Sequence, residues 1–452
     1  MLLKKLLWMK ESENLDAEIR QCADEGKKID DLIPLSSLIK EMPEGEEKES
    51  RAAALLLEME SRPVLPNFPY SEPNRYQEIR ASLTGVPLRS ALPKDQRREK
   101  LLGAWLGRAA GCTLGIPVEG WMRADIRGFL EESGQYPVRG FFRSDVPAAV
   151  REAYRVRDED LNTPYSRKNV CWANNLTGVY PVDDDINYML LALQIMEEHG
   201  TGFSSEDVAE AWLYGIPAMH ACTAERVVYR NLLHRRMPPD SALYLNPFRE
   251  WIGAQIRADL YGYVAAGDPM RASELAYRDA SLSQTKNGLY AAMYTAALIS
   301  AAAVLPDFTE AVQEALLCIP PESRLAEAIR RLLKDYSGGS AFTEVIDRLH
   351  DRYNEHDPFD WCLAIPNALI VTACVLWHGR SYADAVANAV LCGFDTDCNG
   401  ATVGSVVGIS LGAEAIGSPW RDALSPVLTS TVTGFSQISI EEAVSRTLRL
   451  MG

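Results

Sequence analysis

The pattern of apolar and polar residues along this chain of 452 residues predicts helices almost throughout. Apolar side chains recur at spacings of three and four residues, which places them on one face of an α-helix. Alternation of the strand type is rare, and YPVRGFF at 136–142 is the best short strand candidate. We therefore predict an all-α protein. The clearest helical stretches are residues 13–28, 47–61, 206–221, 270–284, 287–305 and 341–356.

Residues 1–95 differ in composition from the rest of the chain. They contain a charged stretch, EMPEGEEKES, and a proline-rich stretch, RPVLPNFPYSEPNRY, and both are typical of connecting segments. We interpret residues 1–95 as an N-terminal helical extension that wraps or abuts the main body. Residues 96–452 then form the main helical domain.

Two series of glycines spaced four residues apart are the clearest internal pattern. The first lies in GAWLGRAAGCTLG (103–115) and the second in GATVGSVVGISLG (400–412). Residues four apart share a helix face, so each series makes a stripe without side chains. A glycine inside a helix costs about 0.5–1 kcal/mol relative to alanine, and a close approach of two helices would offset that cost. We expect both stripes to be tight packing faces in a dense core.

Composition and charge narrow the classes of function. The net charge of −16 argues against nucleic acid or an anionic membrane surface as the main partner. The nine cysteines include no C-x-x-C pair, which is typical of reduced thiols. The N-terminus has no long apolar region with a cleavage site, so we expect no signal peptide and a cytoplasmic location. The weakly charged stretch 401–417 is too short to span a bilayer, and we expect it to be a buried helix.

Two groups of aspartates stand at predicted helix starts. A single acid at such a place is an ordinary cap, but adjacent carboxylates disfavour each other's ionisation unless a cation neutralises them. Ligand sets made only of oxygen suit Mg²⁺, Mn²⁺ or Ca²⁺. We therefore predict a metal site at which the two groups converge. The predicted ligands are Asp183, Asp184, Asp185, Asp395 and Asp397.

Further candidates flank these groups. Glu119 follows the first glycine series, and it becomes a candidate general acid or base if the two series pack together. Trp172 and Asn174 precede the first acidic group and could line a sugar or base pocket, although an ordered polar loop explains them equally well.

These segments together resemble the ADP-ribosylglycohydrolase family. GAWLGRAAGCTLGIPVEG is similar to the family's first glycine-rich helix, VDDDINYMLLAL to its T-D-D-T segment, and GFDTDCNGATVGSVVG to its G-G-D-T-D-T segment. RDASLSQTKNG is a weaker match and puts Gln284 where relatives have a histidine that contacts nucleotide-ribose. The chain also departs from the family at Cys112, which replaces an aspartate, and at Cys398, which replaces a threonine.

The resemblance implies a compact orthogonal bundle of helices with two Mg²⁺ ions, or Mn²⁺ in their place, held by the five aspartates. It implies that Glu119 acts near the scissile bond of an ADP-ribosyl or related ribosyl substrate, either a small molecule or an ADP-ribosylated molecule. Three alternatives stay open: a hydrolase of another nucleoside or glycosyl compound, a non-catalytic binder of ADP-ribose or a related nucleotide, and a scaffold with structural Ca²⁺. The substrate-binding residues that we predict are Trp172, Asn174, Gln284, Gly393 and Phe394.

Overall fold

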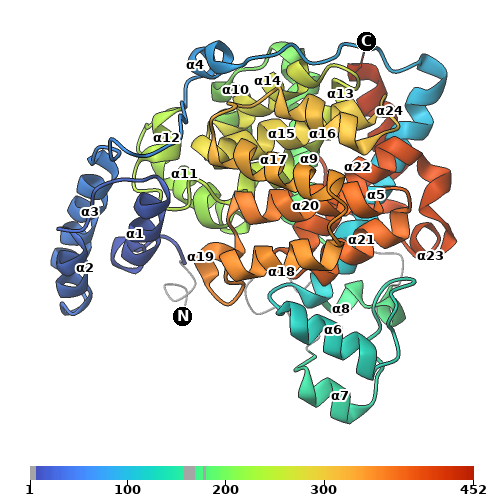
Figure 1. Cartoon of the computed structure of the whole chain (residues 1–452), viewed down its shortest axis with the longest axis horizontal. Helices are drawn as coiled ribbons and strands as arrows, with labels where there is room; N and C mark the ends of the chain where they lie inside the picture. Colours follow the sequence, from blue (N-terminus) through green and yellow to red (C-terminus); the bar gives the residue numbers. More distant parts are fainter. Residues whose placement is uncertain (1–6, 157–167, 177–179, 452) are drawn as a thin grey trace.

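The computed structural model describes residues 7–156, 168–176 and 180–451, and it is built almost entirely of helices (Figure 1). The α-helices of the first half are α1 (Leu15–Asp24), α2 (Ile33–Lys40), α3 (Glu46–Ser61), α4 (Tyr76–Ser82), α5 (Lys94–Gly115), α6 (Arg123–Glu132), α7 (Ala148–Ala153), α8 (Lys168–Cys171), α9 (Asp184–His199), α10 (Ser205–Gly215), α11 (Thr223–Leu233) and α12 (Asp240–Leu243). Those of the second half are α13 (Asp259–Val264), α14 (Pro269–Ala280), α15 (Lys286–Ala302), α16 (Phe308–Leu316), α17 (Arg324–Ser337), α18 (Phe342–Arg352), α19 (Pro358–Trp361), α20 (Ala364–His378), α21 (Tyr382–Leu391), α22 (Thr396–Leu411), α23 (Ser418–Arg421) and α24 (Ile440–Leu450).

Short 3₁₀ helices and one small sheet complete the fold. The 3₁₀ helices are η2 (Glu11–Glu13), η3 (Ile116–Val118), η4 (Ala173–Asn175), η5 (Gly200–Gly202), η6 (Ala218–His220), η7 (Ile252–Arg257) and η8 (Ala413–Ile416). Strands β1 (Val427–Thr429) and β2 (Gln437–Ser439) pair antiparallel, with Leu428 opposite Ile438. The prediction of an all-α fold is confirmed.

The centre of the molecule is the pair α5 and α22, which carry the two glycine series. A Cβ atom added at Gly107 or Gly111 would overlap the backbone carbonyl of Gly404 or Gly400 on the other helix. The absence of side chains therefore lets the two backbones touch, as the spacing predicts. Residues 401–409 are buried as expected, but Leu411, Glu414 and Ala415 are exposed. The stretch 401–417 is not one helix, because α22 ends at Leu411 and Gly412 has a φ of 88°.

The first helix of this pair, α5, is also the start of a long apolar segment. The segment 94–118 is long and apolar enough to cross a membrane by length and composition alone, but 94% of its most apolar part is buried inside the protein. Burial of this kind is typical of a core helix. All nine cysteines lie within the described residues, and none of them forms a disulfide bond.

The predicted helical stretches coincide with helices, but the one predicted strand does not form. α3, α14, α15 and α18 fall on their predicted stretches within a few residues, and 206–221 divides into α10 and η6. The strand candidate 136–142 is wrong, because this segment has no regular structure. Pro137 has no N–H to donate, and the backbone of Arg143 bonds instead to the side chain of Gln135, at 2.7 and 3.1 Å.

The first helices form a separate layer at one end of the molecule. Figure 1 shows α1, α2 and α3 packed together beside α11 and α12. Leu15, Leu55 and Leu56 form a small apolar cluster of their own, which includes Leu245 of the main body. The predicted boundary at residue 95 lies at the start of α5.

Candidate active site

The first acidic group begins helix α9, and its three carboxylates have different partners. Asp183 is the N-cap, and its side chain accepts a hydrogen bond of 2.9 Å from the amide of Asp185. The Asp185 carboxylate accepts from the Arg108 guanidinium at 2.8 Å, where both side chains are fully buried. Asp184 is partly exposed and lines a cavity. Capping thus accounts for one carboxylate, as the sequence predicts.

The second acidic group begins helix α22 after a sharp turn. Gly393 and Phe394 both have positive φ, at 73° and 55°, and this turn leads directly to Asp395. The turn is fixed from outside, because the indole N–H of Trp361 donates to the Phe394 carbonyl at 2.6 Å. The Thr396 hydroxyl donates to the carbonyl of Gly115 at 3.0 Å, which ties this turn to the end of α5.

The contact between α5 and α22 also places Glu119. A Cβ atom at Gly115 would overlap the backbone of Thr396 and Asp397, and η3 then carries the chain from α5 to Glu119. Glu119 lines the same cavity as Asp395 and Asp397. The glycine stripes therefore bring the candidate acid or base next to the second acidic group.

A cavity of about 300 Å³ joins these groups. Five acidic residues line it, which are Glu119, Asp184, Asp395, Asp397 and Glu225. Four aromatic residues from four distant parts of the chain also line the cavity. These aromatic residues are Trp8, Tyr188, Trp251 and Trp361.

Burial raises the pKa values of Asp185 and Asp395. The pKa of Asp185 is raised to about 8, because burial and the charges of Asp397 and Asp184 outweigh the stabilising charge of Arg108. Burial and the neighbouring Asp397 raise the pKa of Asp395 well above its usual value, with a further contribution from Glu119. These carboxyls therefore lack enough positive charge from the protein to ionise together.

The ligand atoms present fit a hard divalent cation. One ligand atom each from Asp185, Asp397 and Cys398 lies within 4.8 Å of the others, and so does a set from Cys112, Asp183 and Asp185. The carboxylate oxygens suit Mg²⁺, Mn²⁺ or Ca²⁺, and a bound cation would lower the raised pKa values. The thiols are poor ligands for such ions, and burial raises the pKa of Cys398 well above its usual value.

The remaining predicted site residues lie away from the cavity wall. Trp172 is buried and packs its ring against Phe129, with centroids 6.0 Å apart. Asn174 accepts a hydrogen bond of 2.8 Å from the amide of Ser144. Gln284 is buried beside Ser283, to which it is hydrogen-bonded. Gly393 and Phe394 shape the turn before Asp395 and do not line the cavity. Their role in substrate binding stays a prediction.

Sequence reasoning missed the charged residues that support the site. Arg108 bridges Asp185 and Asp259, at 2.8 and 2.6 Å. Arg257 bridges Glu225, at 2.8 Å, and Asp279. Arg108 lies inside the first glycine series, and a charged residue at an otherwise apolar core position was a signal available in the sequence. Nothing in the sequence connects Trp8 with residues more than 100 positions away.

Comparison with known proteins gives two positive findings. A family model described as ADP-ribosylglycohydrolase matches residues 93–450. A solved structure described as an ADP-ribosylglycohydrolase-related protein complex aligns over 79% of this chain and 98% of its own, with 21% identity and a TM-score of 0.47. No curated protein matches the chain.

Proposed function

The chain belongs to the ADP-ribosylglycohydrolase family, and from this premise we propose that it is a metal-dependent hydrolase that cleaves the glycosidic bond of an ADP-ribosyl or related ribosyl compound. Family membership supports a glycohydrolase-type function. The observation that carries the proposal is the position of Glu119, which lines the same cavity as Asp184, Asp395 and Asp397.

The aspartates divide into positioning and binding roles. Asp183 caps α9 and so fixes the amide of Asp185. Asp184, Asp185, Asp395 and Asp397 would hold one or two Mg²⁺ ions. A bound Mg²⁺ supplies Lewis acidity and a template for the hydroxyls of a ribose. Arg108 keeps Asp185 oriented through its buried hydrogen bonds.

Glu119 is the residue to which we assign proton transfer. Cleavage of a glycosidic bond passes through an oxocarbenium-like transition state, and a carboxyl near the anomeric carbon protonates the leaving group or deprotonates the attacking water. Glu119 is suited to this role because it lines the cavity together with Asp395. Trp361 keeps the adjacent turn in place.

The experiment compares hydrolysis by the wild type and by Glu119→Gln in Mg²⁺. We expect the substitution to lower kcat by about 10²–10⁴-fold, which is the usual contribution of general acid–base catalysis. The substrates are ADP-ribosyl-arginine, ADP-ribosyl-serine, NAD⁺ and free nucleosides. Glu310→Gln in α16, an exposed glutamate, is the matched control and leaves activity unchanged. Binding of these compounds without turnover of any of them would overturn the assignment as an enzyme.

A further inference from the structure

The candidate metal ligands form two groups, and each group contains one cysteine. In the first group, one ligand atom each from Asp185, Asp397 and Cys398 lies within 4.8 Å of the others. In the second group, the Cys112 thiol donates to Asp183 at 3.5 Å and to Asp185 at 3.8 Å. Asp185 belongs to both groups, and each group offers an ion one sulfur atom beside its carboxylate oxygens.

The two groups differ in their access to the cavity. Asp397 and Cys398 line the cavity of about 300 Å³, so an ion that enters it meets their side chains. Cys112 is fully buried and does not line the cavity. Two further cysteines of the cavity wall, Cys222 and Cys362, lie outside both groups. The group that contains Cys398 is therefore the one to which the cavity gives access.

The sulfur atom of Cys398 changes which cation this group suits. Mg²⁺ takes oxygen ligands in octahedral geometry, and a thiol is a poor ligand for it. Zn²⁺ binds thiolates at about 2.3 Å and carboxylates at about 2.0–2.2 Å, and its catalytic sites have three protein ligands and one open position. The two carboxylates and the thiol of this group make up such a set of three.

The spacing and charge of the group are also close to those of a zinc site. With these bond lengths, ligand atoms around a tetrahedral Zn²⁺ lie about 3.3–3.8 Å apart, so the limit of 4.8 Å closes by a side-chain movement of about 1 Å. Arg108 donates to Oδ1 of Asp185 at 2.8 Å and keeps this ligand oriented. Its positive charge also offsets the single negative charge that remains when Zn²⁺ binds two carboxylates and a thiolate.

On the basis of the metal-dependent function proposed above, we propose that Asp185, Asp397 and Cys398 form a mixed carboxylate–thiolate site that binds Zn²⁺ in preference to Mg²⁺. On binding, the S–H bond of Cys398 breaks, its proton passes to water, and a bond forms between sulfur and zinc. Asp184 and Asp395 also line the cavity and remain for a hard cation such as Mg²⁺.

The first experiment detects the sulfur ligand directly, with Co²⁺ as the probe. Co²⁺ accepts the same ligands as Zn²⁺, and a thiolate ligand gives it a charge-transfer absorption band in the near ultraviolet that oxygen ligands do not give. We expect this band when the full chain is titrated with Co²⁺, and we expect added Zn²⁺ to remove it. Excess Mg²⁺ should leave the band in place. A titration that gives no such band would overturn the mixed site.

Two matched variants locate the sulfur atom. Cys398→Ser exchanges sulfur for oxygen at nearly constant shape, and we expect it to lose the Co²⁺ band. By calorimetry, its affinity for Zn²⁺ should fall by at least about 10-fold, which is the lower end of what even an outer partner of a metal ligand contributes. Its affinity for Mg²⁺ should not fall, because a hydroxyl suits a hard cation, and this result also shows that the variant is folded. Cys222→Ser, elsewhere in the cavity wall, is the control and should keep the band.

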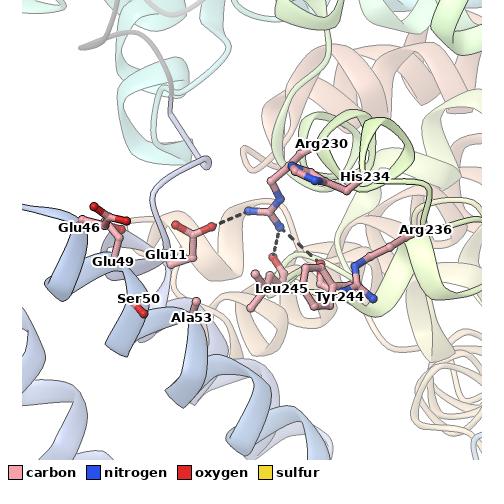
Figure 2. Close-up of a pocket in the computed structure, with 10 residues that line it drawn as sticks. All are labelled: Glu11, Glu46, Glu49, Ser50, Ala53, Arg230, His234, Arg236, Tyr244 and Leu245. Atoms are coloured by element: carbon pink, nitrogen blue, oxygen red, sulfur yellow. Dashed lines mark hydrogen bonds and ion pairs between the residues drawn. The ribbon is translucent and has the colours of Figure 1, made fainter.

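Adventitious binding of Zn²⁺ elsewhere on the protein needs its own control. A second cavity, of about 480 Å³, lies between the extension and α11, and Glu46 and His234 are among its lining residues. Figure 2 shows Glu11 of this cavity pointing toward Arg230, at 2.9 Å. None of its lining residues in the described part of the chain is a cysteine. We expect His234→Ala to keep both the band and the Zn²⁺ affinity. Tight Zn²⁺ binding that is lost in His234→Ala and kept in Cys398→Ser would overturn the site at Cys398.

The outcomes separate the mixed site from the proposed hydrolysis. If Glu119→Gln abolishes Mg²⁺-dependent hydrolysis but Co²⁺ gives no thiolate band, the proposed function stands and the mixed site is refuted. If the band appears in the wild type and is lost in Cys398→Ser while none of the substrates named above is hydrolysed, the mixed site stands and the assignment as an enzyme fails.

Discussion

Two buried acidic regions of this molecule have opposite electrostatics. In the seam between the extension and the main body, Arg249 bonds to Glu18 and Glu25. Burial alone would raise the pKa of Glu25, but the charges of Arg249, Lys286 and Lys27 outweigh it and hold the pKa well below its usual value. In the cavity, burial and neighbouring acids raise the pKa of Asp395.

The difference shows how a structural acid can be told from a ligand-binding one. Equal burial gives opposite pKa shifts, because the seam has its own cations and the cavity has too few. The seam repeats this pattern at Arg324, which bonds to Glu72 at 2.7 Å and to Glu250 at 2.8 Å. In the cavity, Arg108 reaches Asp185 but not the acids of α22. The Mg²⁺ that we propose would offset the charge of these acids.

The largest expected effect comes from removing the acids of α22. The double variant Asp395→Asn with Asp397→Asn should lose measurable Mg²⁺ binding by calorimetry and lose activity by at least about 100-fold, because two of the proposed ligands become neutral. Asp307→Asn, which changes an exposed N-cap aspartate of α16, is the control. Unchanged Mg²⁺ affinity in the double variant would refute the metal site.

The seam should respond to the loss of its cation in a different way. Arg249→Met leaves Glu18 and Glu25 buried without their arginine, which costs about 3–5 kcal/mol. We expect faster hydrogen exchange in α1 and α3 and a lower Tm, with Mg²⁺ affinity nearly unchanged. Arg51→Met, which removes an exposed pair with Glu47, is the control and should change stability by less than about 0.5 kcal/mol.

The cavity acids also differ from the seam acids in what holds them in place. They depend on the backbone contact of α5 with α22, so Gly111→Ala should push the helices apart and cost about 1–3 kcal/mol. Because the same contact places Glu119 beside Asp395, we expect kcat to fall in the folded variant at low temperature. The control is Gly202→Ala, because an added Cβ atom at Gly202 would meet no other atom within 4 Å. Gly134 is unsuitable as a control because its positive φ would strain an alanine.

The smallest expected effect is on pH dependence, and its sign differs between the regions. The lowered pKa of Glu25 stabilises the folded state at pH values above about 4.3, the pKa of a glutamate in the unfolded chain. This stability is lost as the pH falls through the pKa that Glu25 has in the folded state. The raised pKa of Asp185 acts in the opposite sense, and its contribution is lost as pH rises from about 4 to about 8.

Melting curves with and without Mg²⁺ separate these two contributions. In chelator, we expect Tm to decline between pH 5 and 8 as the cavity acids are forced to ionise. Mg²⁺ should remove most of that decline. Below pH 4, both samples should lose stability together, since the seam has its cations within the chain. A decline in Tm toward pH 8 that persists in Mg²⁺ would contradict the proposed neutralisation of the cavity acids by Mg²⁺.

Much of the fold could be predicted because helix periodicity is a local property. α15 and α3 follow from apolar spacing alone, and the glycine stripes predicted the contact of α5 with α22. The strand candidate 136–142 failed because a short apolar run does not determine whether a partner strand exists. The pair β1 and β2 was missed for the same reason, since each strand spans only three residues.

The sequence by itself determined the helical class, the central glycine contact and the two groups of aspartates at helix starts. These depend on periodicity, spacing and capping, which act between residues close along the chain. Only the tertiary structure decided that Arg249 neutralises the glutamates of α1, that Arg108 reaches Asp185, and that Trp8 lines the cavity of Asp395. Whether a buried charge has a partner depends on side chains that are distant in sequence, and folding alone brings them within a few ångströms of one another.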